Sequence, residues 1–505
     1  MPAPPFGIVL LSMKLEEIIE EVALSVEPPS NPEISSVVSD SRRVTPGALF
    51  VAIAGERADG LDYAAEAVRG GACAVASDRP RPQGFPVPVP WVRVDDPRRA
   101  ASVWSQRALG DPWKKLVLAG VTGTNGKTTT AMLLSGVFRR AWGSSGFVGT
   151  IGYGWNETFR AAPRTTPEGD ALARMMSDMV HDGVPACAME VSSHAVALER
   201  VSGVRFDAAV FTNLTRDHLD FHGTMEAYGA AKERLFALRK AGGAAVVNGD
   251  DPWGRAMAAR LAPPVVTFSP AGDPSARWRA EDIEVSLSGT RFRAAGAEGE
   301  ARIESPLVGR FHVENLLAAW AASRALGVPE GAIVAELAQN PGAPGRMERV
   351  DAGQPYTILV DYAHTEDALR RLLSAVRELT DRTLILVFGC GGDRDPGKRE
   401  PMGRAAAELA DIPIATSDNP RGEDPAEILR EVERGLVAGG ASKYLKFVDR
   451  REAIARAIEL ANSRSVVVIA GKGHETTQVI GEREYPFDDR VVAAECVRAA
   501  RRMSS

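Results

Sequence analysis

The sequence contains few cysteines, and none of them is placed in a pattern that binds metal. Its four cysteines, Cys73, Cys187, Cys390 and Cys496, are scattered along the 505 residues. This spacing argues against a disulfide scaffold and against a cysteine-based zinc site. Three of the four lie in apolar or strand-like runs. We therefore expect buried, reduced thiols, as in a cytoplasmic protein.

The sequence also lacks an excess of positive charge. Lysine and arginine number 60 against 66 aspartate and glutamate residues, which gives a formal net charge of −6 at pH 7. A chain of this charge is not expected to use nucleic acid as its main partner. Local basic pockets for small anionic molecules remain compatible with it.

Long apolar runs are absent as well. The candidate for a targeting segment is Phe6 to Leu11. It has no basic leader and is far shorter than the ~20 residues that a membrane-spanning helix needs. We predict no membrane insertion. Because Met13 to Glu17 begins a plausible helix, Met13 is an alternative start of the protein.

The chain is too long for a single core, and its length predicts about three domains. Breaks in the pattern near Pro112 and in the Gly/Pro-rich segment Pro341 to Glu348 place these domains at residues 1–112, 113–344 and 345–505. Short β-rich runs alternate with helical stretches throughout. The predicted class is α/β, with a mostly parallel or mixed sheet flanked by helices in each domain.

A glycine-rich stretch, Gly120 to Thr129, lies between an apolar run and an amphipathic run, so it predicts a strand, a turn and a helix. Glycines let the backbone approach a polyphosphate, Lys127 supplies a mobile charge, and the Thr128 hydroxyl can hold Mg²⁺. Five residues, rather than the usual four, separate Gly120 from Gly126. The stretch predicts nucleotide binding and leaves the product open.

Two further strands of this region end in polar residues. Ala186 to Glu190 ends in a carboxylate where a Mg²⁺ ligand or a water-orienting group belongs, although a solvated strand end would have the same sequence. Phe211 to Gly223 ends in a dense polar cluster. The helix Met225 to Leu238 carries Lys232, for which a solvated surface position is the ordinary expectation.

The last part of the chain contains four strand-like runs, each followed by a polar loop and separated by helical stretches. These runs are Thr357 to Val360, Thr383 to Phe388, Ile412 to Thr416 and Val466 to Ala470. Repeated βα units form a mostly parallel sheet, whose ligands bind at the carboxyl ends of the strands. Arg394, Asp418, Arg421 and Glu475 on these loops would suit a zwitterion.

In the first domain, polar loops at Ser39 to Gly47 and Gly55 to Gly60 can bind ligand, but surface turns have the same composition. Ordered signatures in all three parts together resemble the Mur ligase family from Met13 onward. They are Asp40-Ser41-Arg42, Thr122 to Thr129, Met189 to His194, Asn213 to Gly223, Ala231 to Phe236, Asp361 to His364, Asp418 to Pro425 and Gly471 to Glu475. The resemblance implies a UDP-binding first domain, a central P-loop-type ATPase domain and a C-terminal Rossmann-like domain.

The resemblance also implies a role for each matched residue. Catalysis would fall to Lys127, Glu190, His218 and Lys232. Mg²⁺ would be held by Thr128, Glu190, His218 and, if it is carbamylated, Lys232. ATP would meet Thr122, Gly123, Thr124, Asn125, Gly126, Lys127, Thr128, Thr129, Asn315, Arg346 and Asp361. The UDP-linked substrate would meet Ser39, Ser41, Glu56, Arg57, Ala58, Thr165, Thr166, Ser192 and Arg200. The incoming amino acid would meet Arg394, Asp418, Asn419, Pro420, Arg421, Gly471 and Glu475.

The activity implied is ATP-dependent addition of meso-diaminopimelate to UDP-N-acetylmuramoyl-L-alanyl-D-glutamate (the UDP-MurNAc-dipeptide) in peptidoglycan precursor synthesis. Asp418-Asn419-Pro420-Arg421 resembles the form found in enzymes that add diaminopimelate. Arg421 can grip the extra carboxylate of that amino acid through two hydrogen bonds, and Asn419 can donate to it, whereas lysine has no such group. We expect a cytoplasmic monomer.

Three alternatives stay open at this point: the same ligase with L-lysine as its amino acid, a folylpolyglutamate-synthase-like ligase, and an ATP-dependent switch that makes no product. The first domain argues against the second alternative. Three positions also depart from the family pattern. His312 stands where Asn is usual, Glu366 replaces a proline, and Leu198 replaces a glutamine that contacts substrate in some members.

Overall fold

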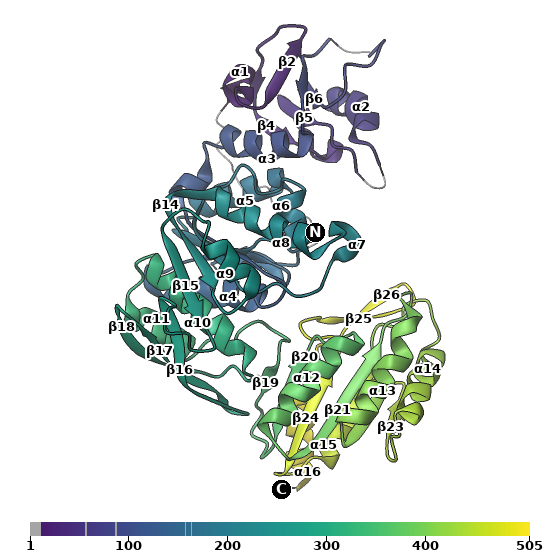
Figure 1. Ribbon diagram of the computed structural model, residues 1–505. Helices are drawn as coiled ribbons and strands as arrows, with labels where there is room; N and C mark the ends of the chain where they lie inside the picture. The colour runs from purple at the N-terminus through teal and green to yellow at the C-terminus, as the bar shows by residue number, and fades with distance from the viewer. Residues whose placement is uncertain (1–11, 56–57, 86–87, 157, 163, 505) are drawn as a thin grey trace. The chain divides into compact units, whose positions relative to one another are not determined.

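The computed structural model describes residues 12–55, 58–85, 88–156, 158–162 and 164–504. The predictions made for Phe6 to Leu11, Glu56 and Arg57 therefore lie outside the described residues. Internal contacts divide the chain into two units. The first extends to Ala280 and includes Ala294–Glu300 and Glu314–Glu336; the second comprises Glu281–Arg293, Ala301–Val313 and Leu337–Ser505. The ribbon in Figure 1 runs from purple at the N-terminus to yellow at the C-terminus.

The first unit begins with a five-stranded sheet of order β2-β7-β6-β5-β4. Its strands are β2 (Ala23–Glu27), β4 (Ser36–Val38), β5 (Ala48–Val51), β6 (Ala72–Ser77) and β7 (Trp91–Val94). All pairs are parallel except β2 with β7. Its helices are α1 (Leu15–Ile19), α2 (Ala64–Arg69) and α3 (Pro97–Ala108), and β1 (Met13–Lys14) pairs with β3 (Glu33–Ile34). The helix predicted from Met13 thus begins at Leu15.

An eleven-stranded sheet follows, of order β11-β10-β9-β12-β8-β13-β14-β15-β16-β17-β18. These strands are β8 (Val117–Thr122), β9 (Gly146–Gly149), β10 (Gly152–Trp155), β11 (Thr158–Arg160), β12 (Ala186–Glu190), β13 (Phe206–Phe211), β14 (Arg239–Asn248), β15 (Val265–Ser269), β16 (Trp278–Ser286), β17 (Gly289–Gly296) and β18 (Gly299–Ser305). The run from β9 to β16 is parallel. The last three strands are divided between the two units.

The helices of this region are α4 (Lys127–Trp142), α5 (Gly169–His181), α6 (Ser193–Ala197), α7 (Leu219–His222), α8 (Met225–Glu233), α9 (Pro252–Ala258), α10 (Phe311–Ala325) and α11 (Glu330–Leu337). The predicted strand, turn and helix around Gly120 to Thr129 are confirmed by β8 and α4. The helix predicted over Met225 to Leu238 is α8 followed by a 3₁₀ turn at Arg234–Leu238.

The second unit holds a six-stranded sheet of order β19-β20-β24-β21-β22-β23. Its strands are β19 (Glu348–Val350), β20 (Thr357–Asp361), β21 (Thr383–Cys390), β22 (Ile412–Ser417), β23 (Leu445–Phe447) and β24 (Ser465–Ala470). All pairs are parallel except that of β19. The predicted parallel sheet is confirmed, and the two strands added to the predicted four are short edge strands. A hairpin, β25 (Thr477–Ile480) with β26 (Arg483–Pro486), follows β24.

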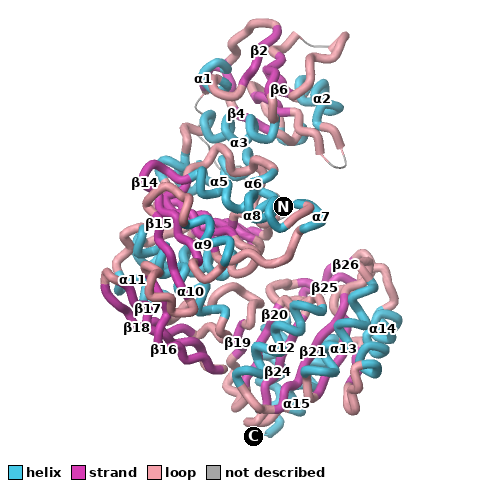
Figure 2. Tube along the Cα trace, in the orientation of Figure 1, coloured by secondary structure: helices cyan, strands magenta, loops and turns pink. Residues whose placement is uncertain are grey.

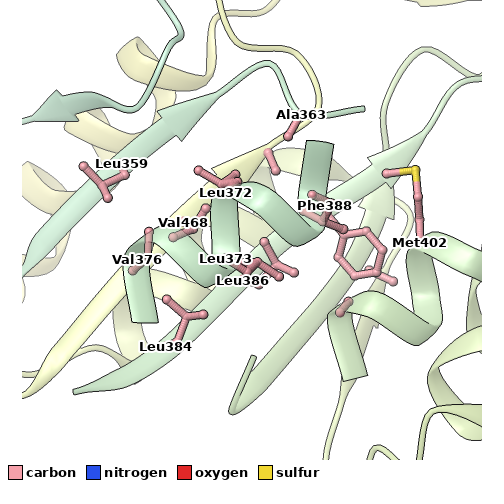
Figure 3. Packing of buried hydrophobic residues seen from close by; sticks show 14 of the residues in the cluster. Leu359, Ala363, Leu372, Leu373, Val376, Leu384, Leu386, Phe388, Met402 and Val468 are labelled. Carbon is pink, nitrogen blue, oxygen red and sulfur yellow. The ribbon is translucent and has the colours of Figure 1, made fainter. Parts of the chain in front are cut away.

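Both faces of this sheet are covered by helices, as Figure 2 shows: α12 (Glu366–Leu379), α13 (Arg399–Leu409) and α14 (Pro425–Ala438) on one face, α15 (Arg450–Leu460) and α16 (Asp489–Ser504) on the other. Side chains alternate along β21. Leu384, Leu386 and Phe388 join the core with α12, whereas Ile385 and Val387 join the core with α15. Figure 3 shows the first of these cores. The continuous apolar run of the sequence thus serves two buried faces.

Within the described ranges, no helix is long and apolar enough to cross a membrane. All four cysteines are free thiols, as predicted. Cys187 and Cys390 are buried, and burial raises the pKa of each of these two thiols to about 12. The other two, Cys73 and Cys496, are half-buried.

Candidate active site

The glycine-rich cradle follows β8 directly, and two of its glycines have backbone geometry that other residues rarely adopt. Gly123 has φ +149° and Gly126 has φ +83°. A Cβ on Gly123 would lie 1.9 Å from the Thr212 hydroxyl, and one on Gly126 would lie 2.2 Å from the Asn315 side-chain oxygen. Asn315, predicted to meet the nucleotide, therefore lies against the cradle.

The residues directly after β13 form hydrogen bonds to the cradle. The Thr212 hydroxyl donates to the Asn125 carbonyl at 2.6 Å, and the Asn125 N–H donates to the Asn213 side chain at 2.9 Å. Asn213 in turn donates to the Glu314 carboxylate at 2.6 Å. Burial raises the pKa of Glu314 to about 7. Asn213 begins the signature Asn213 to Gly223, whereas the sequence predicts no role for Thr212 or Glu314, because it does not show which loop contacts the cradle.

Lys127 lies along the loop that it follows. Its Nζ donates to the Gly123 carbonyl at 2.9 Å and to the Thr124 carbonyl at 2.8 Å. The first residue of α4 therefore points its ammonium back over the turn, where a phosphate would bind to the N–H groups of the cradle.

Glu190 ends β12 in a fully buried position. Its carboxylate accepts hydrogen bonds from the Thr128 hydroxyl at 2.9 Å, from the Thr150 N–H at 2.7 Å and from the Thr150 hydroxyl at 3.2 Å. Burial raises the pKa of this carboxyl, while the nearby Lys127 opposes the rise. The solvated strand end that the sequence left open is thereby excluded. A hydroxyl and a carboxylate this close match the oxygen donors that Mg²⁺ prefers.

The residues assigned to the UDP-linked substrate gather at the same strand end. Thr165 and Thr150 share a hydroxyl–hydroxyl hydrogen bond of 3.0 Å. The Thr166 hydroxyl donates to the Glu190 carbonyl at 2.9 Å and accepts from the Ser192 N–H at 3.2 Å. Arg200 donates to the Thr166 carbonyl at 3.3 Å. The structure thus brings Thr165, Thr166, Ser192 and Arg200 together around Glu190.

Lys232 corrects an expectation from the sequence, because it is buried with 1% of its surface exposed rather than solvated. Its Nζ donates to the Gly123 carbonyl at 2.7 Å and lies 4.3 Å from the centre of the Tyr228 ring. Burial, with the nearby charge of Lys127, lowers the pKa of Lys232 to about 6. The amine is therefore largely neutral at pH 7. The tertiary fold, and not the helical pattern, places this residue under the cradle.

His218 lies in a cluster of imidazoles at the start of α7. Its ring centre is 4.8 Å from that of His194, which is 5.5 Å from that of His222. His222 shares a 3.0 Å hydrogen bond with the Ser193 hydroxyl. In the described part of the chain, no three His, Cys, Asp or Glu side chains are grouped to hold a metal. The predicted set contains only two residues of these types, Glu190 and His218, so it stays a prediction.

Of the predicted residues of the first domain, Ser39 contacts α5, and Ser41 and Ala58 lie in local turns. The Ser39 N–H donates to the Asp170 carboxylate at 3.4 Å, and Ser41 begins a 3₁₀ turn capped by Asp40. The Ala58 carbonyl accepts from the Gly55 N–H at 2.9 Å.

The first domain also reaches the substrate residues through α3, since its Ser102 hydroxyl donates to the Arg200 carbonyl at 3.0 Å. Gly203 contacts the same turn, because a Cβ there would lie 2.3 Å from the Ser102 carbonyl oxygen. These contacts connect the first domain to the end of β12.

In the second unit, Asp361 ends β20 and is tied to two backbone N–H groups. Its carboxylate accepts from Met347 at 2.8 Å and from Ala363 at 2.8 Å. Burial raises the pKa of this carboxyl, and the nearby Arg346 opposes the rise. The Arg346 guanidinium lies over the Tyr362 ring at 5.2 Å. The two residues assigned to the nucleotide in this unit are therefore neighbours.

The loops after β22 and β24 meet around a buried lysine. The fully buried Lys472 donates to the Glu475 carboxylate at 2.9 Å and to the Asn419 side-chain oxygen at 3.1 Å. Asn419 also donates to Glu475 at 2.9 Å. The pKa of Glu475 is lowered, because the charge and hydrogen bond of Lys472 outweigh its burial. The Asn419 amide, predicted to donate to substrate, thus holds Glu475 in place.

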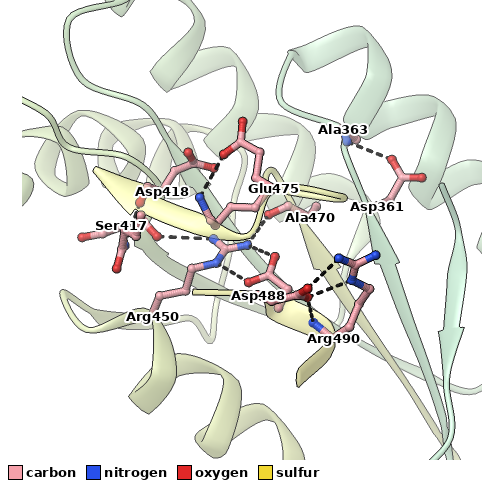
Figure 4. Close-up of polar contacts among 12 residues, drawn as sticks. Asp361, Ala363, Ser417, Asp418, Arg450, Ala470, Glu475, Asp488 and Arg490 are labelled. Carbon is pink, nitrogen blue, oxygen red and sulfur yellow. Dashed lines mark hydrogen bonds and ion pairs between the residues drawn. The ribbon is translucent and has the colours of Figure 1, made fainter. Parts of the chain in front are cut away.

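A buried ion pair anchors both of these loops. Arg450 and Asp489 are fully buried and bond to each other at 2.8 and 2.7 Å. The same guanidinium donates to the carbonyls of Ser417 at 3.3 Å and Ala470 at 3.0 Å, the residues before Asp418 and Gly471 (Figure 4). Sequence reasoning missed this pair, since its members are far apart in the chain and in no motif.

The remaining predicted residues lie beside these. A Cβ on Gly471, which has φ +117°, would lie 2.6 Å from the Asp418 carboxylate, and burial raises the pKa of Asp418. The Pro420 carbonyl accepts from the Glu423 N–H at 3.1 Å. Arg421 and the exposed Arg394 occupy adjoining loops after β22 and β21. The carboxyl ends of three neighbouring parallel strands therefore supply the predicted amino-acid site.

Comparison with family models matches three regions of the chain. Residues 33–108 match "Mur ligase family, catalytic domain", residues 121–323 match "Mur ligase middle domain", and residues 345–473 match "Mur ligase, glutamate ligase domain". The three matches follow one another along most of the chain. They correspond to the three sheets described above.

Two curated proteins are similar over almost the whole length. The UDP-N-acetylmuramoyl-L-alanyl-D-glutamate–2,6-diaminopimelate ligase of Geobacillus kaustophilus is 46% identical over 93% of this chain and 96% of its own. The protein of the same name from Geobacillus thermodenitrificans is 44% identical over 97% and 100%. A solved structure titled as the same ligase has a TM-score of 0.74 and 34% identity, and covers 97% of this chain and 100% of its own.

Proposed function

This chain belongs to the Mur ligase family, and we propose that it adds meso-diaminopimelate to the D-glutamyl γ-carboxylate of UDP-N-acetylmuramoyl-L-alanyl-D-glutamate with the use of ATP. The observation that supports the choice of amino acid is that the loop after β22 carries Arg421 and bonds to Glu475 through Asn419, while the adjoining loop after β21 carries Arg394. Two guanidinium groups and a carboxylate suit an amino acid with two carboxylates and a free ammonium. The names of the similar curated proteins support the same substrate.

The first step proposed is activation of the D-glutamyl γ-carboxylate. A carboxylate is a poor acylating agent, so its oxygen attacks the γ-phosphorus of ATP, forming an acyl phosphate and releasing ADP. Lys127 and the N–H groups of the cradle would bind the phosphates. Thr128 and Glu190 would hold Mg²⁺, which supplies positive charge to the phosphate oxygens.

The second step joins the amino acid. The amine attacks the acyl carbon, the C–O bond to phosphate breaks, and inorganic phosphate leaves as the amide forms; the amine loses a proton on the way. Arg394 and Arg421 would hold carboxylates of the incoming amino acid, and Glu475 would accept from an ammonium. Holding both reactants in place lowers the entropic part of the barrier.

Lys232 is proposed to react with CO₂ and carry a carbamate. Addition of CO₂ requires a neutral amine, and the lowered pKa of about 6 makes the Lys232 amine neutral at pH 7. Nζ forms a bond to the carbon of CO₂ and loses a proton to solvent, so the product is an anion beside the cradle. It can serve the Mg²⁺ site, which an ammonium would repel. Thr128, Glu190, His218 and the carbamate would then share this role.

Phosphate release with each amino acid tests the proposed function. The protein is incubated with ATP, Mg²⁺, the UDP-MurNAc-dipeptide and either meso-diaminopimelate or L-lysine. We expect turnover with diaminopimelate, at least about 100-fold above lysine in kcat/KM, because lysine lacks the second carboxylate and so leaves Arg421 without its partner. Equal turnover of both would contradict the specificity, and turnover of neither would contradict the assignment.

The variant R421A sharpens this test. Loss of one two-pronged carboxylate contact should reduce kcat/KM for diaminopimelate by about 10- to 100-fold and leave that for lysine within about twofold. The exposed Arg371, which pairs with Asp367 on α12, offers a matched control as R371A. An equal loss for both amino acids would show that Arg421 does not read the second carboxylate.

The alternatives predict other results. A folylpolyglutamate-synthase-like ligase would release phosphate with a folate and glutamate rather than with the UDP-linked substrate. A switch that makes no product would release no phosphate when all substrates are present. The substrates proposed place the reaction in the cytoplasm, where we expect the protein to act as a monomer; light scattering of the purified protein measures that state.

A further inference from the structure

Two loops of the second unit carry the arginines assigned to the amino acid, and they are joined to each other by hydrogen bonds. The Gly392 N–H donates to the Asn419 carbonyl at 2.9 Å, and the Arg421 guanidinium donates to the Gly392 carbonyl at 2.8 Å. A Cβ on Gly392 would lie 2.0 Å from the Pro420 carbonyl oxygen. The backbones of the two loops are thus in contact beside the guanidinium groups.

Both loops contain a residue in the left-handed region, where residues other than glycine are uncommon. Asp393, which precedes Arg394, and Arg421 each have φ +51°. Such conformations persist when the surrounding structure holds them, and they cluster at functional sites. Here the Gly422 N–H donates to the Asp393 carboxylate at 2.9 Å. Asp393 is therefore held by the N–H group of Gly422, which directly follows Arg421 in the other loop.

Glu423 completes this connection and is itself fixed from the core. Its carboxylate accepts from the Asp393 N–H at 2.6 Å. It also accepts two hydrogen bonds from Arg399, at 2.9 and 2.8 Å. Arg399 is the first residue of α13, has 3% of its side chain exposed, and makes a further bond to Glu431 of α14 at 3.1 Å. Glu423 thus links a buried cation to the loop that carries Arg394.

We propose that Glu423, held by Arg399, is a positioning residue that sets the separation of the Arg394 and Arg421 guanidinium groups and so selects an amino acid with two carboxylates. This inference rests on the proposed function. Arg394 is exposed and its guanidinium donates to its neighbour's carbonyl, so its place depends on the backbone of Asp393. That backbone is held by the Glu423 carboxylate. Bonds to an ionised group are about twice as strong as neutral ones, so the charge of Glu423 matters to the link.

The variant E423Q tests the proposal, with E431Q as its matched control. Both variants remove a carboxylate that bonds to Arg399, but only Glu423 also bonds to the Arg394 loop. We expect E423Q to raise KM for diaminopimelate about tenfold, with KM for ATP and for the UDP-MurNAc-dipeptide within about twofold. E431Q should change none of the three KM values by more than about twofold.

Comparison of amino acids and a double mutant separate positioning from general damage. E423Q should lower the kcat/KM ratio of diaminopimelate to lysine about tenfold, because lysine lacks the second carboxylate. In the R421A background the effect of E423Q on KM for diaminopimelate should shrink to about twofold or less. The reason is that Arg421 is already absent, so the separation of the two guanidinium groups no longer matters. Additive effects would overturn the proposal.

Two outcomes keep the inference distinct from the proposed function. If the wild-type protein does not turn over diaminopimelate, the proposed function fails. If the wild type is active and E423Q, folded by its thermal midpoint, leaves KM for diaminopimelate unchanged, this inference alone fails. Should E423Q not fold, R399K provides the second variant: it keeps a cation but loses the two-pronged bond, and the same tenfold rise in KM is expected.

Discussion

The phosphate cradle of the first unit and the amino-acid loops of the second unit hold their charges in different ways. Lys127 and Lys232 donate to backbone carbonyls of the cradle, and the pKa of Lys232 falls to about 6. In the amino-acid loops the buried cations bond to carboxylates: Arg450 to Asp489 and Lys472 to Glu475. The two lysines of the cradle therefore have backbone carbonyls as their hydrogen-bond acceptors, whereas the buried cations of the loops are paired with carboxylates before any ligand binds.

The largest effect expected is on the stability of the loops. R450M would leave Asp489 buried without its partner, which costs about 3–5 kcal/mol in the free energy of unfolding. Urea unfolding of the full chain measures this loss. The double variant R450M/D489L, which removes both charges of the pair, should recover much of it. A loss below about 1 kcal/mol for R450M would show that the loops do not depend on the pair. It would contradict the contrast between paired cations in the loops and carbonyl-bonded lysines in the cradle.

The next effect concerns the cradle. K127M should reduce kcat by about 100- to 1,000-fold, because one fixed positive charge at the phosphates is lost. Its thermal midpoint should fall less than that of R450M, since the hydrogen bonds of Lys127 go to the backbone carbonyls of Gly123 and Thr124 rather than to a fully buried carboxylate partner. K114M, which removes an exposed lysine paired with Asp111, is the control and should keep full activity. A loss of stability in K127M as large as that in R450M would contradict the difference proposed between the cradle and the amino-acid loops.

A smaller effect is the dependence of activity on pH through Lys232. Lys232 is neutral above pH 6 and becomes charged as the pH falls through about 6, so the proposed carbamate is lost on the acid side. We expect kcat to drop about tenfold for each pH unit below 6, and to fall in buffer depleted of CO₂ and recover with bicarbonate. Activity that is flat through pH 6 and indifferent to bicarbonate would exclude the carbamate.

The lowered pKa of Lys232 also makes the stability of the fold depend on pH. An unfolded Lys232 has its ordinary pKa of 10.5, so between pH 6 and pH 10.5 the unfolded chain binds more protons at this residue than the folded chain does. The contribution of Lys232 to stability therefore rises with pH through this window. A K232M variant should lack that rise, which urea unfolding at several pH values would detect.

The smallest effect is expected for an exposed pair of the second unit. Arg371 and Asp367 of α12 bond at 2.9 Å with 60% and 73% of their side chains exposed. Solvent screens such a pair, so R371A should change the free energy of unfolding by less than about 0.5 kcal/mol. A larger loss would show that burial does not explain why the Arg450–Asp489 pair contributes more to stability than surface pairs do.

Much of the architecture follows from local pattern in the sequence. The parallel strands of the last sheet are continuous apolar runs, and β21 is recognisable because residues on both of its faces are buried. The strands β19 and β23 could not be predicted in the same way. Each has three residues and lies at an edge, so its hydrogen bonds to the sheet define it rather than its composition.

The candidate site divides along similar lines. Residues inside motifs, such as Glu190 and Asp418, were predicted because a polar residue at the end of an apolar strand is a local signal. No role was predicted for Arg450, Asp489, Glu314 or Thr150. Each acts on a residue far away in sequence, and a sequence does not show which distant residues meet.

By itself, the sequence determined the class of the domains, the cradle with its extra residue, and the loop Asp418-Asn419-Pro420-Arg421 that indicates the amino acid. These features depend on residues that are close together in the chain, so their physical meaning can be read locally. Only the tertiary structure decided that Lys232 is buried with a lowered pKa, that the Asn419 amide holds Glu475, and that Glu423 connects the two arginine loops. Burial and partnership of charges arise from packing, and packing brings together residues that the sequence keeps apart.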